Sequence, residues 1–146
     1  MSSATAWGGL IARAFIKDYL RDYPELAKSI RLLVTVNSPL NGMLGAEIGV
    51  QHSPIVVPVW RDIATGSAFL QDLNAWHWPG RIPWHLFFSY LDDQGGDGVV
   101  PLQSQIPLNR QAEAKRLYGF NVSHAGILSD PAFIAQINAV LAGSLR

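Results

Sequence analysis

The chain has 146 residues, of which 49% are hydrophobic and 15% are charged, so its size and apolar content fit one compact domain and exclude a disordered or fibrous chain. Its 11 Lys and Arg residues balance 11 Asp and Glu residues, and without any basic run there is no electrostatic footprint for nucleic acid or an anionic membrane. The absence of cysteine excludes disulfides and thiolate metal sites but fits any compartment. No signal-peptide pattern or membrane-spanning apolar stretch occurs, so the compartment stays unknown, with the cytoplasm as the default expectation.

Apolar residues first recur at helical spacing. Over residues 8–20, a stripe of Leu10, Ile11, Ala14, Phe15 and Leu20 predicts an amphipathic helix. A helical turn is expected after Pro24. The remaining elements are expected in the order strand, helix, strand, strand, helix, at residues 30–36, 67–73, 84–90, 116–120 and 131–141.

This order predicts an α/β fold with a short parallel sheet flanked by helices. The long connection at residues 43–83 carries Trp60, Phe69, Trp76 and Trp78, and it is expected to form a cap or lid over the strand ends. Its aromatic side chains fit either an apolar substrate pocket or ordinary core packing.

An acid and a histidine follow two successive predicted strands. Asp97 lies in the glycine-rich segment after the strand ending near Tyr90, and His124 follows the strand ending near Phe120. Because loops beyond the carboxyl ends of parallel strands meet at one rim, we expect the two side chains to lie together. Such an aspartate could hold the histidine as a general base. For a lone Asp-Gly pair the organisation of a turn is the favoured interpretation, and a histidine can cap or pack; the two residues together leave both interpretations open.

The segment at residues 4–8 has the outline of a nucleophile turn without its serine. Ala4 and Gly8 supply the small residues that a strained strand-to-helix turn needs on either side of the central position. The central residue is Ala6, which has no hydroxyl and cannot form an acyl-enzyme. Trp7 follows it, so its backbone amide would be an oxyanion-hole donor. Ser3 and Thr5 are nearby hydroxyls, but this geometry points only the central residue into the crevice.

Four motifs together resemble the lipase and esterase-like branch of the α/β-hydrolases. They are WGGLIAR at residues 7–13, LVTVNSPLNG at 33–42, DGVVPL at 97–102 and SHAGIL at 123–128. The resemblance covers nearly all of the chain but only the C-terminal part of a typical family member. It implies a single, incomplete α/β-hydrolase domain at residues 1–146, with a lid-like insertion at 43–83.

The resemblance also implies an activity and roles for site residues. The chain would be similar to a serine ester hydrolase that uses a Ser-Asp-His triad without a cofactor, with Asp97 as the acid and His124 as the base. The nucleophile position would be Ala6, and the Trp7 amide would belong to the oxyanion hole. The expected substrate is a small apolar ester or acyl compound, although the same triad also serves thioesters and amides.

The differences from the family pattern leave a second function open. The family's Gly-x-Ser-x-Gly corresponds here to Ala4-Thr5-Ala6-Trp7-Gly8, and the strands that precede this turn in the family have no counterpart. The alternative is therefore a catalytically inactive remnant, or a domain that binds an apolar ligand or a partner chain. A misassigned start, a truncation, a split half-enzyme and an inactivated variant would all give this sequence. An exposed sheet edge would then favour self-association.

The other histidines give no metal-binding pattern. His52, His77 and His85 lack the short paired spacing of a helical metal site, so no metal is expected. His52 is interpreted as part of a turn, and His85 alternates with apolar residues and is expected to be a hydrogen-bonded packing residue.

Overall fold

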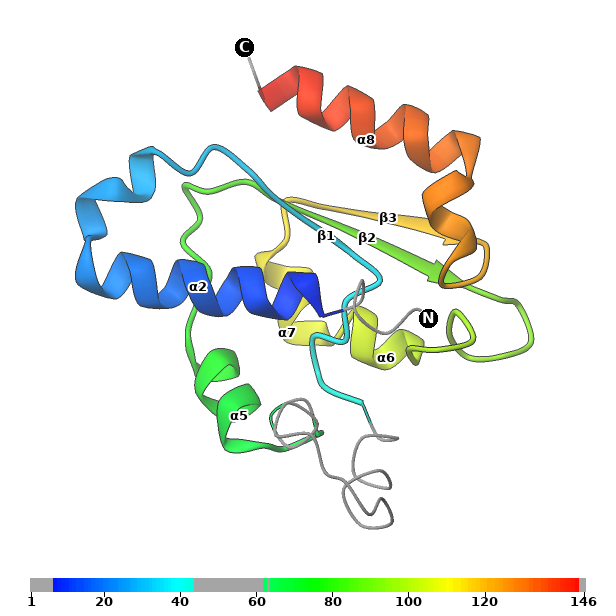
Figure 1. The fold of residues 1–146 in the computed structure, drawn as a ribbon, viewed down its shortest axis with the longest axis horizontal. Coiled ribbons are helices and arrows are strands. Elements are labelled where there is room, and N and C mark those ends of the chain that lie inside the picture. The colour runs from blue at the N-terminus through cyan, green and yellow to red at the C-terminus, as the bar shows by residue number, and fades with distance from the viewer. Residues whose placement is uncertain (1–6, 44–61, 63, 145–146) are drawn as a thin grey trace.

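The computed structural model describes residues 7–43, 62 and 64–144 of the chain. Three strands alternate with helices along this part of the sequence (Figure 1). In chain order the elements are α2 (Gly8–Asp22), η1 (Pro24–Lys28), β1 (Leu33–Val36), α5 (Ala68–Ala75), β2 (Trp84–Tyr90), α6 (Leu102–Gln105), α7 (Leu108–Glu113), β3 (Arg116–Asn121), η2 (Gly126–Ser129) and α8 (Pro131–Ser144).

The three strands form one parallel sheet in the order β1-β2-β3. Leu33 of β1 lies opposite Trp84 of β2, and Phe87 of β2 lies opposite Tyr118 of β3. Helix α8 covers one face of the sheet and α2 lies on the other, so the domain has three layers (Figure 1). The predicted α/β class, with a short parallel sheet flanked by helices, is confirmed.

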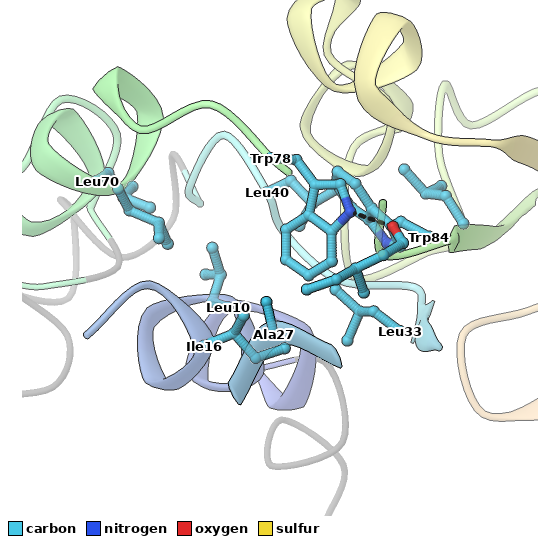
Figure 2. Close-up of a cluster of buried hydrophobic side chains, with 11 residues drawn as sticks. Leu10, Ile16, Ala27, Leu33, Leu40, Leu70, Trp78 and Trp84 are labelled. Carbon is cyan, nitrogen blue, oxygen red and sulfur yellow. Dashed lines mark hydrogen bonds between the residues drawn. The ribbon is translucent and has the colours of Figure 1, made fainter. Parts of the chain in front are cut away.

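Each face of the sheet has its own hydrophobic core, because successive side chains of a strand point to opposite faces. The core under α2 contains Leu33, Trp84 and Leu86 from the strands, together with Leu10 and Ile16 from the helix (Figure 2). The core under α8 is built from four buried side chains, Phe87, Ile127, Phe133 and Val140. β1 and β2 are therefore covered on both faces, whereas the side chains of β3 are mostly exposed. Among the described residues, β1 and β3 are the two edge strands of the sheet.

The buried face of α2 differs from the predicted apolar stripe. Ile11 and Phe15 are 62% and 65% exposed, and the buried residues are Gly9, Leu10, Arg13 and Ile16. Arg13 belongs to the inner face because its guanidinium lies over the ring of Trp84, 4.7 Å from the centroid, and because it pairs with Glu113 at 3.1 Å. The prediction that Ile11 and Phe15 face the core was wrong, since a buried, paired arginine takes the place of an apolar side chain.

The described part of the predicted lid, from residue 64 to residue 83, packs into the core under α2. Leu70 and Leu73 of α5 are buried there, and so are Trp78 and Ile82 of the following loop. The indole nitrogen of Trp78 donates a hydrogen bond to the carbonyl oxygen of Ile82 at 2.7 Å (Figure 2). For Trp78, core packing is therefore the observed role. Trp60 and residues 44–61 lie outside the described residues, so a lid over the strand ends stays a prediction.

Two short helices, α6 and α7, were not predicted from the sequence. Each begins after a proline, Pro101 or Pro107, and each is no more than two turns long. Helical periodicity cannot be recognised over so few residues. These helices join β2 to β3 on the side of the sheet that carries α2 (Figure 1).

Candidate functional site

The loops after β2 and β3 meet at the carboxyl end of the sheet (Figure 1). The backbone amide of His124 donates a hydrogen bond to the carbonyl oxygen of Asp97 at 2.9 Å, so the two loops are joined directly. Asp97 is 1% exposed and His124 is 6% exposed. The structure therefore brings together the two residues that the sequence predicts as acid and base.

The side chains of Asp97 and His124 are joined by a hydrogen bond. His124 Nδ1 lies 2.7 Å from Asp97 Oδ2. The other carboxylate oxygen, Oδ1, accepts hydrogen bonds from the backbone amides of Val99 and Val100, at 2.9 and 2.7 Å. Contacts to both of its oxygens fix the carboxylate in one orientation, in which Oδ2 can accept a hydrogen bond from an Nδ1–H of the imidazole.

The free ring nitrogen of His124 determines what this pair can do chemically. In the described part of the chain, no side chain hydrogen-bonds to Nε2. An imidazole that donates from Nδ1 to a carboxylate presents Nε2 as an acceptor, and the carboxylate stabilises the imidazolium formed on protonation. The pair could therefore act as a general base at the carboxyl edge of the sheet, with Nε2 of His124 as the proton acceptor.

The glycine-rich loop around Asp97 allows this geometry. The carbonyl oxygen of Gly96 accepts a hydrogen bond from the Leu91 amide at 2.7 Å, and an added Cβ at Gly96 would lie 2.4 Å from the carbonyl oxygen of Val100. Gly98 has a φ of +90°, which side chains rarely adopt. The loop can fold back over the carboxylate only because these two positions carry no side chain.

Asn37 supports the histidine loop from the end of β1. Its side-chain amide donates to the carbonyl oxygen of His124 at 3.1 Å, and its own φ is +47°. The residue is 2% exposed, and its Oδ1 has no hydrogen-bond partner in the described part of the chain. The sequence marks Asn37 only as the end of a strand, and nothing in its spacing indicates the contact with His124.

Gln105 supports the acid loop from α6. Its amide group donates to the carbonyl oxygens of Ser89 and Val100, both at 3.0 Å, and accepts from the Ser89 amide at 3.2 Å. This buried side chain joins the end of β2 to the residue whose amide binds Asp97. Sequence reasoning missed Gln105 because a single glutamine in a short helix carries no periodic signal.

The start of α2 lies beside the end of β1. A Cβ added to Gly9 would come within 2.2 Å of Ser38 Oγ and 2.9 Å of a Thr35 methyl group, so the helix approaches the strand closely. Trp7 precedes the first residue of α2, and its carbonyl oxygen accepts a hydrogen bond from the Ile11 amide at 3.0 Å. The helix therefore begins at the same edge of the sheet that carries Asp97 and His124. Ala6, the predicted nucleophile position, lies outside the described residues.

The remaining histidines do not gather at this edge. His77 is exposed, and His85 of β2 lies 3.0 Å from the hydroxyl of Tyr118, as expected of a hydrogen-bonded strand residue. His52 lies outside the described residues. Among residues 7–43, 62 and 64–144, no group of three metal-ligating His, Asp or Glu side chains occurs. In the same ranges, no helix is long and apolar enough to cross a bilayer.

Arg13, Arg110 and Glu113 form a second buried charged group, beside Trp84 at the start of β2. Burial, and then the charge of Arg110, lower the pKa of Arg13 to about 10, which leaves the guanidinium protonated near neutral pH. Burial acts to raise the pKa of Glu113, but the hydrogen bonds and charges of the two arginines outweigh it and hold this pKa below its usual value. Glu113 is therefore an anion between two cations, which fits a structural role in joining α2 to α7.

No family model, no curated protein and no solved structure matches this chain.

Proposed function

We propose that this chain carries the acid and base of an α/β-hydrolase site of the lipase and esterase type. The observation that carries the proposal is the buried pair of Asp97 and His124, with Nδ1 and Oδ2 2.7 Å apart and Asp97 Oδ1 held by two backbone amides. The pair lies at the edge where substrate sites of parallel sheets form, and in the described part of the chain no side chain hydrogen-bonds to the second ring nitrogen. The four motifs of the resemblance support the same assignment.

The proposed chemistry is acyl transfer from a small apolar ester. A hydroxyl at position 6 would lose its proton to His124 Nε2 as its oxygen attacks the ester carbonyl carbon, and the imidazolium would then protonate the leaving alcohol. Asp97 would stabilise that imidazolium, and the Trp7 amide would donate to the oxyanion. The chain has Ala6 at this position, so it supplies the relay without the nucleophile.

Ester hydrolysis by the purified chain and its variants tests this proposal. With a short-chain chromogenic ester, we expect no enzymatic rate for the parent chain and a rate at least about tenfold above background for Ala6→Ser. Adding His124→Ala to Ala6→Ser should abolish the gain, whereas adding His77→Ala should not, because His77 is exposed and outside the site.

The outcomes separate the alternatives. A gain that survives His124→Ala would contradict the role of the base. Activity of the parent chain that is lost with His124→Ala would show that a group other than residue 6 is the nucleophile. An Ala6→Ser variant that folds like the parent chain and remains inactive would contradict the proposed site.

A second candidate function is the binding of an apolar ligand without catalysis. Ala6 favours it, and so does an open pocket of about 690 Å³ beside α6 and α7, which is lined in part by Leu102, Ile106 and Leu108. Leu108 is 83% exposed there, so its side chain is open to an apolar ligand. Saturable binding of a non-hydrolysable alkyl ether, weakened by Leu108→Asp and unchanged by His124→Ala, would favour this function over the first.

A further inference from the structure

A separate pocket lies at the amino ends of the strands, at the opposite end of the sheet from Asp97 and His124. It has a volume of about 440 Å³, within the range of small-molecule sites. Arg31 before β1, Pro83 before β2 and Lys115 before β3 form one side, and the second half of α8 forms the other. The proposed hydrolase site does not use this pocket.

The pocket carries a concentration of positive charge. Arg31, Lys115 and Arg116 line it, and none of the lining residues that the structure describes is acidic. No ion pair involves any of these three side chains among the residues that the structure describes. Because the whole chain has equal numbers of positive and negative residues, this excess is local.

The carbonyl end of α8 offsets only part of that charge. Gly143 and Ser144, at the end of the helix, line the pocket. A helix C-terminus carries roughly half of one negative charge, and its influence falls off within the last turn. Three cations exceed what this end of a helix can balance, so the described lining of the pocket keeps a net positive charge.

His85 and Tyr118 place polar groups among the cations. Their rings are stacked, with centroids 5.8 Å apart, and His85 Nδ1 lies 3.0 Å from the Tyr118 hydroxyl. Burial, and then the charges of Lys115 and Arg116, lower the pKa of His85. The titration of His85 therefore responds to the charges that line the pocket.

The pocket also has apolar lining residues, which lie among polar ones such as Gln136 and Ser144. Leu32 and Pro83 line it from the strand ends, and Val140 of α8 is a buried member of the adjacent core. An ion that is only hydrated would leave this surface unused. Guanidinium groups bind carboxylates and phosphates through paired N–H donors, so the cations and the apolar surface together select a ligand that has both characters.

We propose that this pocket binds a small organic anion, in which a carboxylate or phosphate group is attached to a short apolar body. The anionic group would lie among Arg31, Lys115 and Arg116, and the apolar body would pack against Leu32, Pro83 and Val140. Exchange of the counter-ions and water around the three cations for one bound oxyanion adds charge-assisted hydrogen bonds at the mouth of the pocket.

Proton NMR of the His85 imidazole in the full chain tests this proposal. Four probes distinguish the contribution of the anionic group from that of the apolar body: hexanoate and hexyl phosphate have both, hexan-1-ol has only the apolar body, and inorganic phosphate has only the anionic group. The His85 signal is assigned by its loss in His85→Gln. We expect hexanoate or hexyl phosphate to shift this signal saturably and to raise the pKa of His85, because a bound anion cancels the field of the cations. Hexanol and inorganic phosphate should need at least about tenfold higher concentrations.

Charge variants provide the control. Lys115→Gln and Arg116→Gln should each weaken binding of the preferred probe about tenfold, the loss expected for one charge-assisted contact. Arg21→Gln also removes one exposed cation, but Arg21 lies on α2 beside Asp18 and Asp22, so binding should be unchanged.

Three results would overturn the proposal. The first is the absence of any saturable shift of the His85 signal up to about 10 mM probe, because binding weaker than that is too weak for a specific site. The second is an equal shift with sodium chloride at the same ionic strength. The third is equal binding of inorganic phosphate and hexyl phosphate, which would mean that the apolar surface does not contribute to binding. A preference between hexanoate and hexyl phosphate identifies the anionic group and supports the proposal.

Discussion

At the scale of single residues, Asn37 shows how the candidate site depends on a backbone conformation. Its φ of +47° lies in the left-handed region, which asparagine tolerates better than most residues. This conformation directs its amide to the carbonyl oxygen of His124, 3.1 Å away. One residue at the end of β1 therefore fixes the loop that carries the base.

Two substitutions of Asn37 separate backbone strain from the lost hydrogen bond. Asn37→Gly removes the hydrogen bond but accepts the positive φ, whereas Asn37→Ala also has to adopt a strained backbone. We expect Asn37→Ala to lower the free energy of unfolding by about 1 kcal/mol more than Asn37→Gly does. Urea unfolding of both variants measures the difference, and equal losses would mean that the positive φ is not a source of strain.

The ionisation of Glu113 is expected to make the free energy of unfolding depend on pH. Its pKa is held below its ordinary value of 4.5 by the two arginines, against the effect of burial, so the folded state binds this proton less readily than the unfolded state does. The contribution of Glu113 is therefore fully present above pH 4.5 and is lost as the pH falls through the lower, folded-state pKa. Unfolding by urea at a series of pH values should show this loss, and Glu113→Gln should show a smaller one.

The same substitution leaves two buried guanidinium groups without their anion. Arg13 and Arg110 have side chains that are 1% and 2% exposed, so we expect Glu113→Gln to cost about 3 kcal/mol at neutral pH. Glu25→Gln is the matched control, because Glu25 is exposed in η1 and its loss should have little effect. Similar costs for the two variants would contradict the structural role of Glu113.

At the scale of elements, two neighbouring glycines can be used to test how closely α2 packs against β1. A Cβ at Gly9 would overlap Ser38 Oγ at 2.2 Å, whereas a Cβ at Gly8 would meet nothing within 4 Å. Alanine is normally favoured over glycine in a helix by about 0.5–1 kcal/mol. We expect Gly8→Ala to be neutral or stabilising and Gly9→Ala to be destabilising, as measured by thermal unfolding. A stabilising Gly9→Ala would show that the helix and the strand are further apart.

How far the sequence predicts each element depends on how periodic that element is. The strand at residues 84–90 was predicted with its observed bounds, because it is a nearly continuous apolar run. Residues 30–36 and 8–20 were each predicted within three residues of the observed ends. α6 and α7 were missed because each is too short to show a helical period.

Charged and polar contacts were the hardest features to predict. Arg13 reads as a surface residue of an amphipathic helix, and only the distant Glu113 and Trp84 explain its burial. Asp97 and His124 could be predicted because parallel strands place their following loops together. Asn37 and Gln105 could not, because their contacts cross between elements with no pattern in the sequence.

At the scale of the whole molecule, exposed apolar groups on α2 lead us to predict self-association. Phe15 and Ile11 are more than half exposed, and Phe15 stacks on Tyr19 at a centroid distance of 5.6 Å. In the described part of the chain, β1 pairs with another strand on one side only. We expect concentration-dependent association in sedimentation velocity, reduced in a Phe15→Lys variant and unchanged in Lys28→Gln, which is exposed elsewhere. A monomer at all concentrations would contradict this prediction.

The central claim is that His124, held by Asp97, activates a hydroxyl placed at position 6. A fluorophosphonate ester, which labels activated serines covalently, tests it most directly when the added mass is measured on the intact chain. We predict labelling at position 6 of Ala6→Ser, and its loss when either His124→Ala or Asp97→Asn is added. Labelling that persists without His124, or a folded Ala6→Ser variant that is not labelled, would contradict the claim.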